Sequence, residues 1–503
     1  MHTEAENAGT SGDDLDKGMG MLLYDGMCSQ VLGVFTSGAF LVAFALLLGA
    51  SNKVIGLLAA VGPFAQILQI PAIYLVNWTR KRKLLVVLTS VVGRLFWILV
   101  AALPWFAPAP ARIPLLLFSM FAFFGLGAIS SCAFNSWMRD FVPERRMGGF
   151  FAKRMALATA LGAALSLVAG AGVDVFKRYF TEEIGAYSIL FASGTFFGLL
   201  GLYFLSRVPE PRMAPQPAGN LLGTLIEPVR DREYRKLLIF LAAWSFAVNF
   251  AGPFFTVYML QRLGLNMTWI LALAVASQFV NVLFFRIWGK LADRFSNKSC
   301  IAVAGPLFIF TFLMWPFTTL PERYFLTVPL LIVIHVLAGV STAGVGLCAG
   351  NLALKAAPYG RATAFLAVNA LVSGMAATLA PIVAGFAADF FSQQELSLTI
   401  DWKSLADAGA QFTLPAVSLR GLDFVFVVAF VLGLYATHRL LAVKELGEVE
   451  EEVVLTELYA EVRRASRNVS NVAGIRHLFY FPFAVVRRAK SIVDRANNQG
   501  HDG

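Results

Sequence analysis

The chain is 503 residues long, and 58% of its residues are hydrophobic while only 14% are charged. This charged share is about half that of a soluble domain, so there is too little polar sequence to cover a water-soluble fold. The same composition excludes intrinsic disorder, and four cysteines are too few for a disulfide scaffold. We therefore predict an all-α integral membrane protein.

The net charge is +10, from 41 Lys and Arg residues against 31 Asp and Glu residues. In a soluble protein this excess would favour nucleic-acid binding. In a membrane protein, basic loops on the cytoplasmic side are its ordinary cause. We expect the second explanation, and no nucleic-acid partner.

Twelve apolar segments are long enough to cross the hydrocarbon core as helices. The third is interrupted only by Arg94, and the last is the weakest because Asp423 lies inside its start. In chain order, the predicted spans are 29–49, 54–76, 84–106, 113–134, 155–173, 185–206, 237–260, 268–285, 300–320, 325–350, 362–388 and 421–438.

Both chain termini are predicted to be cytoplasmic. With twelve spans, the loops on one side carry 20 Lys and Arg residues and those on the other side carry 8. Because basic loops stay in the cytoplasm, we expect a multi-pass protein of the cell membrane with cytoplasmic tails at 1–28 and 444–503. No cleavable signal peptide is expected before the first span, because residues 1–28 are polar and acidic.

The chain repeats at an offset of 216 residues. Residues 132–135 read CAFN and fall on residues 348–351, which read CAGN. Chance similarity between apolar helices is the competing explanation, and the matched polar positions argue against it. We predict two pseudo-symmetric six-helix bundles, 29–206 and 236–443, joined by a proline-rich cytoplasmic linker at 207–235.

Residues 289–298 read GKLADRFSNK, which resembles a loop motif of the major facilitator superfamily, G-x-L-a-D-r-x-G-r-k, between its eighth and ninth helices. Ser296 replaces the second glycine, and Asn297 replaces a basic residue. The loop at 77–83 corresponds by the repeat and keeps the basic run, with Asn77 in place of the aspartate. The span count, the repeat and the linker extend the resemblance over about 29–443.

The resemblance implies that both loops are gates. The aspartate caps a helix of the other half and the basic residues pair with carboxylates such as Asp140 or Glu144, which latches the outward-open state. The alternative is that these loops collect Arg and Lys through topology alone, and it is equally strong at 77–83 because Asn77 is uncharged. The gating residues are Gly289, Asp293, Arg294, Lys298, Asn77, Arg80 and Arg82.

Polar side chains inside the spans are the candidates for substrate binding, because they are costly in a membrane. Arg94, near mid-depth, could bind an anionic group, or it could be a structural arginine that snorkels. Asn249 is the first candidate, because Pro253 frees backbone carbonyls nearby. Bonding between helices is the alternative role for the amides. The candidates are Asn249, Arg94, Gln66, Gln69, Gln278, Asn281, Asn369 and His335.

A coupling proton has no obvious carrier, because no Asp or Glu lies near the middle of a predicted span. Asp25 precedes the first span, Asp174 follows the fifth and Asp389 ends the eleventh. The coupling candidates are Asp25 and His335, since histidine titrates near neutral pH. Facilitated diffusion without a coupling ion also stays open.

Motifs of soluble catalysis are absent from the sequence. A P-loop is missing, which argues against an ATP-driven pump. A metal-ligand cluster, a G-x-S-x-G elbow and a dinucleotide fingerprint are missing as well. We expect no enzyme activity, no metal and no cofactor. The expected partners are a small-molecule substrate and the lipid bilayer, and the protein is expected to be a monomer.

Two segments lie outside the repeat. Residues 390–420 form the longest external loop, to which the sequence assigns no role. Residues 444–503 begin with an amphipathic helix pattern, and aromatic residues at 479–483 lead into a basic run at 487–490. Such a segment suits the inner-leaflet interface, and docking to another protein is an equal alternative.

These features predict a secondary or facilitative transporter that moves a small solute by alternating access. Two alternatives stay open. One is a drug or lipid exporter of the same fold, which the Phe-rich helices would suit. The other is a non-transporting receptor or scaffold that acts through the C-terminal tail.

Overall fold

A computed structural model describes residues 12–211, 221–319, 322–358, 362–403, 411–445 and 447–469. Within these residues, twelve helices are long and apolar enough to cross a membrane. This confirms the all-α membrane fold class and the predicted number of spans.

The helices follow the predicted apolar segments in chain order. Up to residue 206 they are α1 (Gly12–Thr36), α2 (Gly38–Leu47), α3 (Asn52–Ala65), α4 (Gln69–Thr79), α5 (Arg82–Phe106), α6 (Ala109–Phe141), α7 (Glu144–Tyr179) and α8 (Ile184–Ser206). Beyond it they are α9 (Leu221–Arg230), α10 (Arg232–Val257), α11 (Met267–Arg294), α12 (Asn297–Met314), α13 (Thr327–Ala356), α14 (Ala362–Phe391), α15 (Leu422–Leu440) and α16 (Glu451–Val469). The shorter elements are η1 (Gln66–Leu68), η2 (Tyr258–Arg262), η3 (Pro316–Thr318), β1 (Glu395–Lys403) and β2 (Gln411–Arg420).

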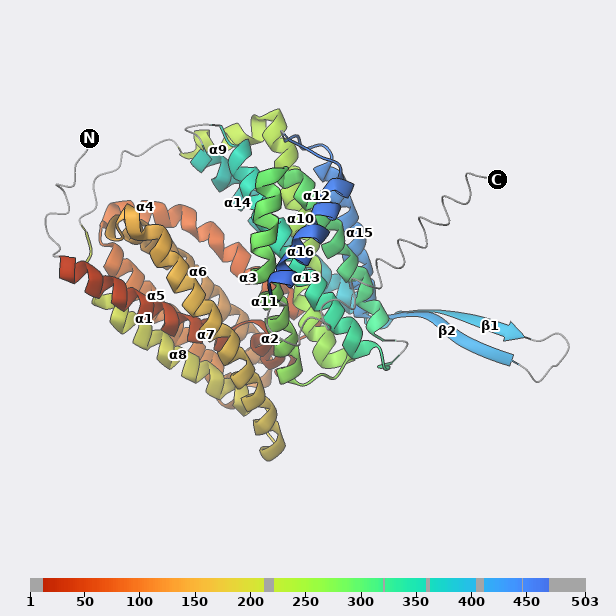
Figure 1. The fold of residues 1–503 in the computed structure, drawn as a ribbon. Helices are drawn as coiled ribbons and strands as arrows, with labels where there is room; N and C mark the ends of the chain where they lie inside the picture. The colour runs from red at the N-terminus through yellow and green to blue at the C-terminus, as the bar shows by residue number, and fades with distance from the viewer. Residues whose placement is uncertain are drawn as a thin grey trace.

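We call α1–α8 the first half and α10–α15 the second half. The first half, red to yellow, lies on the left of Figure 1, and the second half, green to blue, lies on the right. In the first half α1 packs against α8 and α5 against α6, and in the second half α10 packs against α14 and α15. Helix α9 falls in the predicted linker and packs against α10 and α14.

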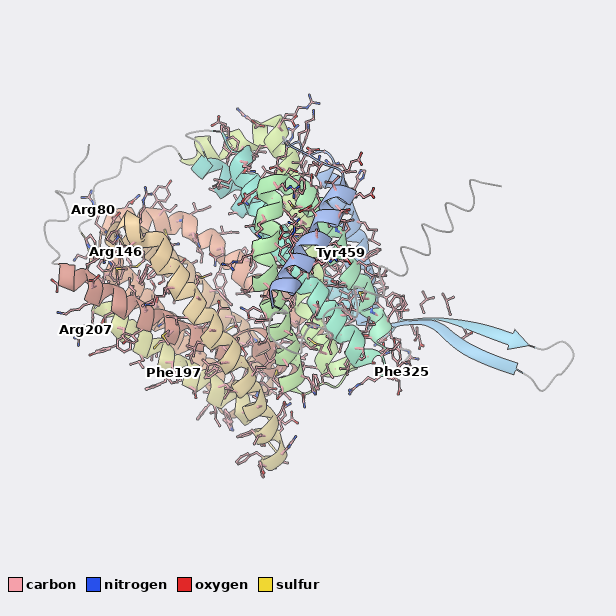
Figure 2. The ribbon with its side chains drawn as sticks, viewed as in Figure 1. Arg80, Arg146, Phe197, Arg207, Phe325 and Tyr459 are labelled. Carbon is pink, nitrogen blue, oxygen red and sulfur yellow. The ribbon has the colours of Figure 1, made fainter. Side chains whose placement is uncertain are left out.

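The two ends of the helix assembly differ in what they carry. One end, which we call the terminal face, carries the start of α1 and the α4–α5 turn (Figure 1), and the α11–α12 turn lies on the same side because six spanning helices separate it from the α4–α5 turn. The exposed Arg80, Arg146 and Arg207 lie at this end of the first half (Figure 2). The opposite end, which we call the hairpin face, carries β1 and β2, with Phe325 near their base (Figure 2).

Helix α1 begins well before the predicted span at 29. Leu15, Met19 and Leu22 lie on one side of this extension and pack into an apolar cluster of the first half, with Leu22 only 1% exposed. This apolar stripe stabilises the helix although its other side is polar and acidic. The expectation that Asp25 precedes the first span is therefore wrong, because the candidate span is Asp14–Leu47 and contains Asp25.

The external loop without an assigned role forms a β-hairpin between α14 and α15. Strands β1 and β2 pair antiparallel, with Glu395 opposite Arg420. Their side chains form an ion pair at 2.5 Å. Residues 395–402 read ELSLTIDW, and this alternation of polar and apolar residues is a strand signal that the sequence analysis did not use.

The first part of the C-terminal tail docks onto its own chain. Helix α16 lies against α11 and α12 of the second half (Figure 1). Val454, fully buried, and Leu458 join the apolar core of that half. The aromatic and basic segments at 479–483 and 487–490 lie outside the described residues.

Replacing Val454 by aspartate is expected to detach α16. The change removes roughly 1.5–3 kcal/mol of apolar burial and would bury a carboxylate without a partner. Limited proteolysis of the purified protein should then cut within 445–469 at least several-fold faster than in wild type. Val453→Asp is the matched control, because Val453 is 45% exposed and the helix should stay protected. Equal cleavage of the two variants would contradict the docking.

Candidate functional site

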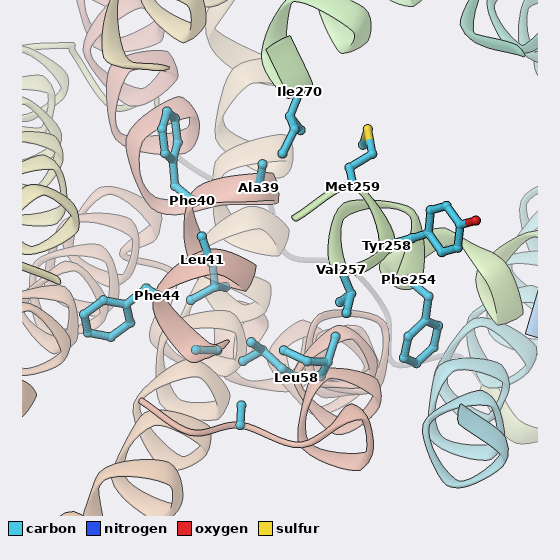
Figure 3. Close-up of a cluster of buried hydrophobic side chains, with 14 of the residues drawn as sticks. Ala39, Phe40, Leu41, Phe44, Leu58, Phe254, Val257, Tyr258, Met259 and Ile270 are labelled. Atoms are coloured by element: carbon cyan, nitrogen blue, oxygen red, sulfur yellow. The ribbon is translucent and has the colours of Figure 1, made fainter. Parts of the chain in front are cut away.

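An apolar cluster joins the two halves at the hairpin face. From the first half it contains Phe40, Phe44 and Leu58 of α2 and α3, and from the second half it contains Val257 and Ile270 (Figure 3). Each of these side chains is at most 5% exposed. Because each contributes roughly 1.5–3 kcal/mol when removed from water, the cluster stabilises closure of this face.

Toward the terminal face, the apolar core is divided. One cluster consists of first-half residues packed around Trp137 and Phe141. Another consists of residues of the second half and its tail, packed around Trp288 and Leu352. The structure is thus closed across the halves at the hairpin face, while each half has a core of its own toward the terminal face.

Two aspartates bind across the halves at the hairpin face. Asp174, near the end of α7, accepts hydrogen bonds from the first two backbone N–H groups of α11, at 2.9 and 2.8 Å. Asp389, near the end of α14, accepts them from the first two N–H groups of α3, at 3.0 and 3.4 Å. A carboxylate at a helix N-terminus satisfies free donors and interacts favourably with the helix dipole. Each aspartate therefore fastens one half to the other.

A glycine one turn before each aspartate allows this close approach. A Cβ on Gly385 would lie 3.0 Å from the Cα of Lys53, and one on Gly170 would lie 3.4 Å from the Cα of Thr268. Both segments read A-G-x-x-x-D, at 169–174 and at 384–389. Both aspartates were expected only as residues at span ends. The shared A-G-x-x-x-D pattern is the sequence signal that identifies Asp174 and Asp389 as a pair.

The basic side chains of the loop at 289–298 face the tail of their own half. Arg294 pairs with Glu457 at 2.7 Å, and Lys298 pairs with Glu448 at 2.8 Å. Burial opposes the ionisation of Glu448, but its hydrogen bond with Lys298 prevails and lowers the pKa of this carboxyl. Asp293 is exposed. In this conformation the described ion pairs of the loop therefore lie within one half.

Gly289 of the same loop lies against α13, where a Cβ would meet Leu347 at 3.8 Å. This is ordinary contact distance, so the structure does not itself require glycine at this position.

The loop at 77–83 is anchored by Arg82, which is fully buried. Its guanidinium pairs with Asp140, one of the carboxylates named for the latch, but within the first half and in the present conformation; Nη2 donates to the carbonyl of Pro211 at 2.7 Å. Arg80 is exposed and ends α4 with a left-handed φ of 52°. Asn77 is half-buried. Arg82 therefore fixes both the α4–α5 turn and the chain that leaves the first half.

Replacing Arg82 by methionine is expected to destabilise the protein by roughly 3 kcal/mol, because several charge-assisted hydrogen bonds at a buried site are lost together. Thermal unfolding of the purified protein measures this change. Arg80→Met removes a charge from the same loop at an exposed position and should stay within about 0.5 kcal/mol of wild type. A similar loss in both variants would show that the buried contacts do not matter.

A cavity of about 430 Å³ lies within the first half. Residues of α1, α5, α6, α7 and α8 line it, so it differs from the expected site between the halves. Its walls combine aromatic rings with hydroxyl groups, and among the described residues that line it Asp25, Arg94 and Arg154 are charged. The aromatic residues are Trp97, Phe123, Phe124 and Phe134, and the hydroxyl-bearing residues are Ser29, Thr36, Ser37, Thr89, Ser90, Ser130 and Ser131.

The three charged side chains form one connected cluster. Asp25, 3% exposed, pairs with Arg154 at 3.3 Å. Ser29 donates to Asp25 at 3.4 Å and accepts from Arg94 Nη2 at 3.1 Å. Arg94 also donates to the carbonyl of Gly198, where a Cβ would lie 3.2 Å from the arginine Cδ. Arg154 thus pairs with the carboxylate directly, and Arg94 is connected to it through Ser29.

The cavity brings together Arg94 and Asp25, which the sequence analysis proposed for separate roles. It adds Arg154, which the analysis missed because this residue directly precedes the predicted span at 155–173 and was counted as a loop charge. Helix α7 in fact begins at Glu144, so Arg154 lies well inside it. The sequence pattern does not distinguish Arg154 from a loop residue, because basic residues are common at the cytoplasmic ends of spans.

The other substrate candidates do not line this cavity. Most have hydrogen-bond partners in their own or a neighbouring helix, which is the structural role weighed against binding. Asn249 donates to Ser245 O at 2.7 Å, and Asn281 donates to Thr342 Oγ1 at 2.8 Å. Gln69 donates to Gln66, and Asn369 accepts from Ser373 at 3.2 Å. His335 Nδ1 lies 2.8 Å from Leu331 O, and Gln278 is exposed.

Twelve helices long enough to span a membrane, in two halves that close on each other at one face, with a charged cavity inside the first half, are the architecture of a membrane transporter. The model of the Major Facilitator Superfamily matches residues 26–381, and the chain belongs to this superfamily. A protein of Bacillus subtilis (strain 168), printed as "Uncharacterized MFS-type transporter YxiO", is 26% identical over 208 residues. That match spans 39% of this chain and 48% of the relative, about half its length.

Solved structures with the same fold are also transporters. The nucleoside transporter NupG is 13% identical with a TM-score of 0.60, over 85% of this chain and 98% of that one. A bacterial homologue of the human lysosomal transporter Spinster, inward-facing and unoccupied, is 15% identical with a TM-score of 0.60, over 89% and 99%. At these identities the likeness shows the fold alone.

Proposed function

We propose that this protein moves a small solute across the membrane by alternating access between its two halves. The division of the apolar core carries the proposal. One cluster and two aspartate caps join the halves at the hairpin face, while separate clusters serve each half toward the terminal face. A contact set confined to one face can break when the halves rock and contacts form at the other face.

We propose that the structure, whose apolar cluster between the halves lies at the hairpin face, represents the state that is open at the terminal face. We propose that this face is cytoplasmic, because it carries the more basic set of loops. On this assignment the state is inward-open, and both termini lie in the cytoplasm. The loop at 289–298 pairs with α16 in this state, and its latch to the first half would form in the outward-open state.

Asp25 is the residue that we propose for proton coupling. It is buried beside Arg94 and Arg154, so its protonation would free two cations to bind elsewhere. His335 is a weaker candidate, since it lies outside the cavity and next to the carbonyl of Leu331. In proteoliposomes, flux through an Asp25→Asn variant should no longer respond to a pH gradient. Flux that keeps its pH response would exclude this role.

A receptor or scaffold that acts through its tail is the competing proposal. Helix α16 already uses its buried face to pack on α11 and α12, so this part of the tail is engaged within the protein. A drug or lipid exporter of the same fold would pass through the same conformational cycle. It would differ from a small-solute transporter in the ligand that it binds.

The experiment that tests alternating access needs no substrate. Spin labels are attached in pairs to a variant without the four native cysteines, reconstituted in liposomes. One pair, at positions 78 and 354, reports the terminal face, and the other, at 47 and 269, reports the hairpin face; Trp78, Leu354, Leu47 and Trp269 are all exposed. Two populations with opposite changes at the two faces are expected. A single, unchanging distance at both faces would favour the scaffold.

A further inference from the structure

We infer that the cavity of the first half binds an organic anion, an oxyanion group on a compact apolar body. This inference rests on the proposed function and names its substrate class. It is carried by the charges of the cavity, by two N–H groups that lack acceptors and by the character of the walls.

The cavity has more cationic than anionic groups. Arg94 and Arg154 both line it, and Asp25 is the acidic residue among its described lining residues. The side-chain charges therefore leave one positive charge without a partner at the cluster. A buried unpaired charge is costly, so a monoanion that completes the cluster is favoured over a neutral or cationic molecule.

Two residues that line the cavity each carry a buried N–H donor without an acceptor among the described residues. One donor is Nε of Arg154, whose terminal Nη2 binds Asp25. The other is the indole Nε1 of Trp97, a residue that is only 1% exposed. Buried donors are almost always paired in folded proteins, so acceptors from a ligand would complete them. An oxyanion offers several lone pairs to such donors.

The walls show what the anion is attached to. Phe123, Phe124 and Phe134 present aromatic surface, which suits an apolar body and gives a bare inorganic ion nothing to contact. The volume of about 430 Å³ lies within the range of small-molecule sites, roughly 300–1,000 Å³. The shared chemistry covers carboxylates and phosphate esters alike.

Thermal stabilisation of the purified, full-length protein tests the inference with matched probes. Phenylacetate and phenyl phosphate carry the oxyanion on an aromatic ring, while phenylacetamide and phenethylamine keep the ring and change the charge. Butyrate replaces the ring by an alkyl chain, and inorganic phosphate removes the organic body. At equal concentrations, one or more of the organic anions should raise the melting temperature, whereas the amide, the amine and inorganic phosphate should not.

Variants locate the binding. Trp97→Phe keeps the ring and removes the unpaired donor, so binding of the stabilising anion should weaken roughly tenfold or more. Arg154→Gln should weaken it further, by roughly 100-fold, because a charge is lost as well. Trp105→Phe is the matched control, since Trp105 is 54% exposed and does not line this cavity, and binding should be unchanged.

Four outcomes would overturn the inference: no stabilisation by any organic anion, equal stabilisation by the amide or the amine, equal stabilisation by inorganic phosphate, or full binding by Arg154→Gln. None of these outcomes changes the result of the spin-label experiment, because that experiment measures distances without any ligand. Stabilisation by a cation such as phenethylamine would exclude an organic anion as the substrate but would not contradict alternating access. Fixed label distances would exclude transport even if an anion binds.

Discussion

Replacing Asp25 by asparagine is expected to lower the stability of the protein by roughly 3–5 kcal/mol. The carboxylate is 3% exposed, pairs with Arg154 and is linked to Arg94 through Ser29. Its loss would leave two guanidinium groups inside the helix bundle without their counter-charge, and breaking a buried ion pair costs about this much. Thermal or denaturant unfolding of the purified variant measures the loss.

A second substitution separates the ion pair from the packing of the residue. Arg154→Met in the Asp25→Asn background removes one of the uncompensated charges, so the double variant should recover part of the lost stability. The matched control is Asp16→Asn, because Asp16 and Arg146 join the same two helices, α1 and α7, at 2.7 Å but are 66% and 58% exposed. An exposed pair contributes about 0–1 kcal/mol. Equal losses at the two pairs would refute the argument.

Replacing Asp174 and Asp389 together by asparagine is expected to open the hairpin face. Each carboxylate binds two backbone N–H groups at the start of a helix of the other half, and loss of its charge weakens that contact by about 1–2 kcal/mol. The two sites lie on different helix pairs, so their effects should add. A combined shift of about 2–4 kcal/mol changes the ratio of the two states roughly 30- to 1,000-fold.

Spin labels at positions 47 and 269 measure this opening, and each single variant should give about half of the free-energy shift. Asp231→Asn is the matched control. Asp231 also caps a helix through two backbone N–H groups, those of Glu233 and Tyr234, but within its own half. It should lower stability without moving the labels. An unchanged distance in the double variant, or the same change in the control, would rule out the proposed latch.

Much of the candidate site was within reach of the sequence, and part of it was not. Arg94 and Asp25 could be singled out because a charge in or near an apolar run is rare. Their meeting could not, since the ion pair of Asp25 joins residues 129 positions apart in the chain. Asn249 and His335 are also polar residues within apolar spans, yet their hydrogen bonds are within their own helices. That a polar residue is rare in a span does not show which direction its side chain faces.

The sequence by itself determined the number of spans, their order and the position of the two basic loops that it predicts to be gates. These features are local, because the length of an apolar run and the residues that flank it decide whether a segment crosses the membrane. The extension of α1 and the docking of α16 needed the tertiary structure, since each depends on an apolar face meeting a distant surface, around Leu22 and Val454.

Only the tertiary structure decided which face is closed. Under the proposed mechanism, the sequence must contain the contacts of both conformations, the A-G-x-x-x-D segments for closure of the hairpin face and the basic loops for closure of the terminal face. In such a mechanism a small free-energy difference selects between the two arrangements of the same helices. That difference arises from contacts between the halves, and the one-dimensional pattern of the chain does not rank such contacts.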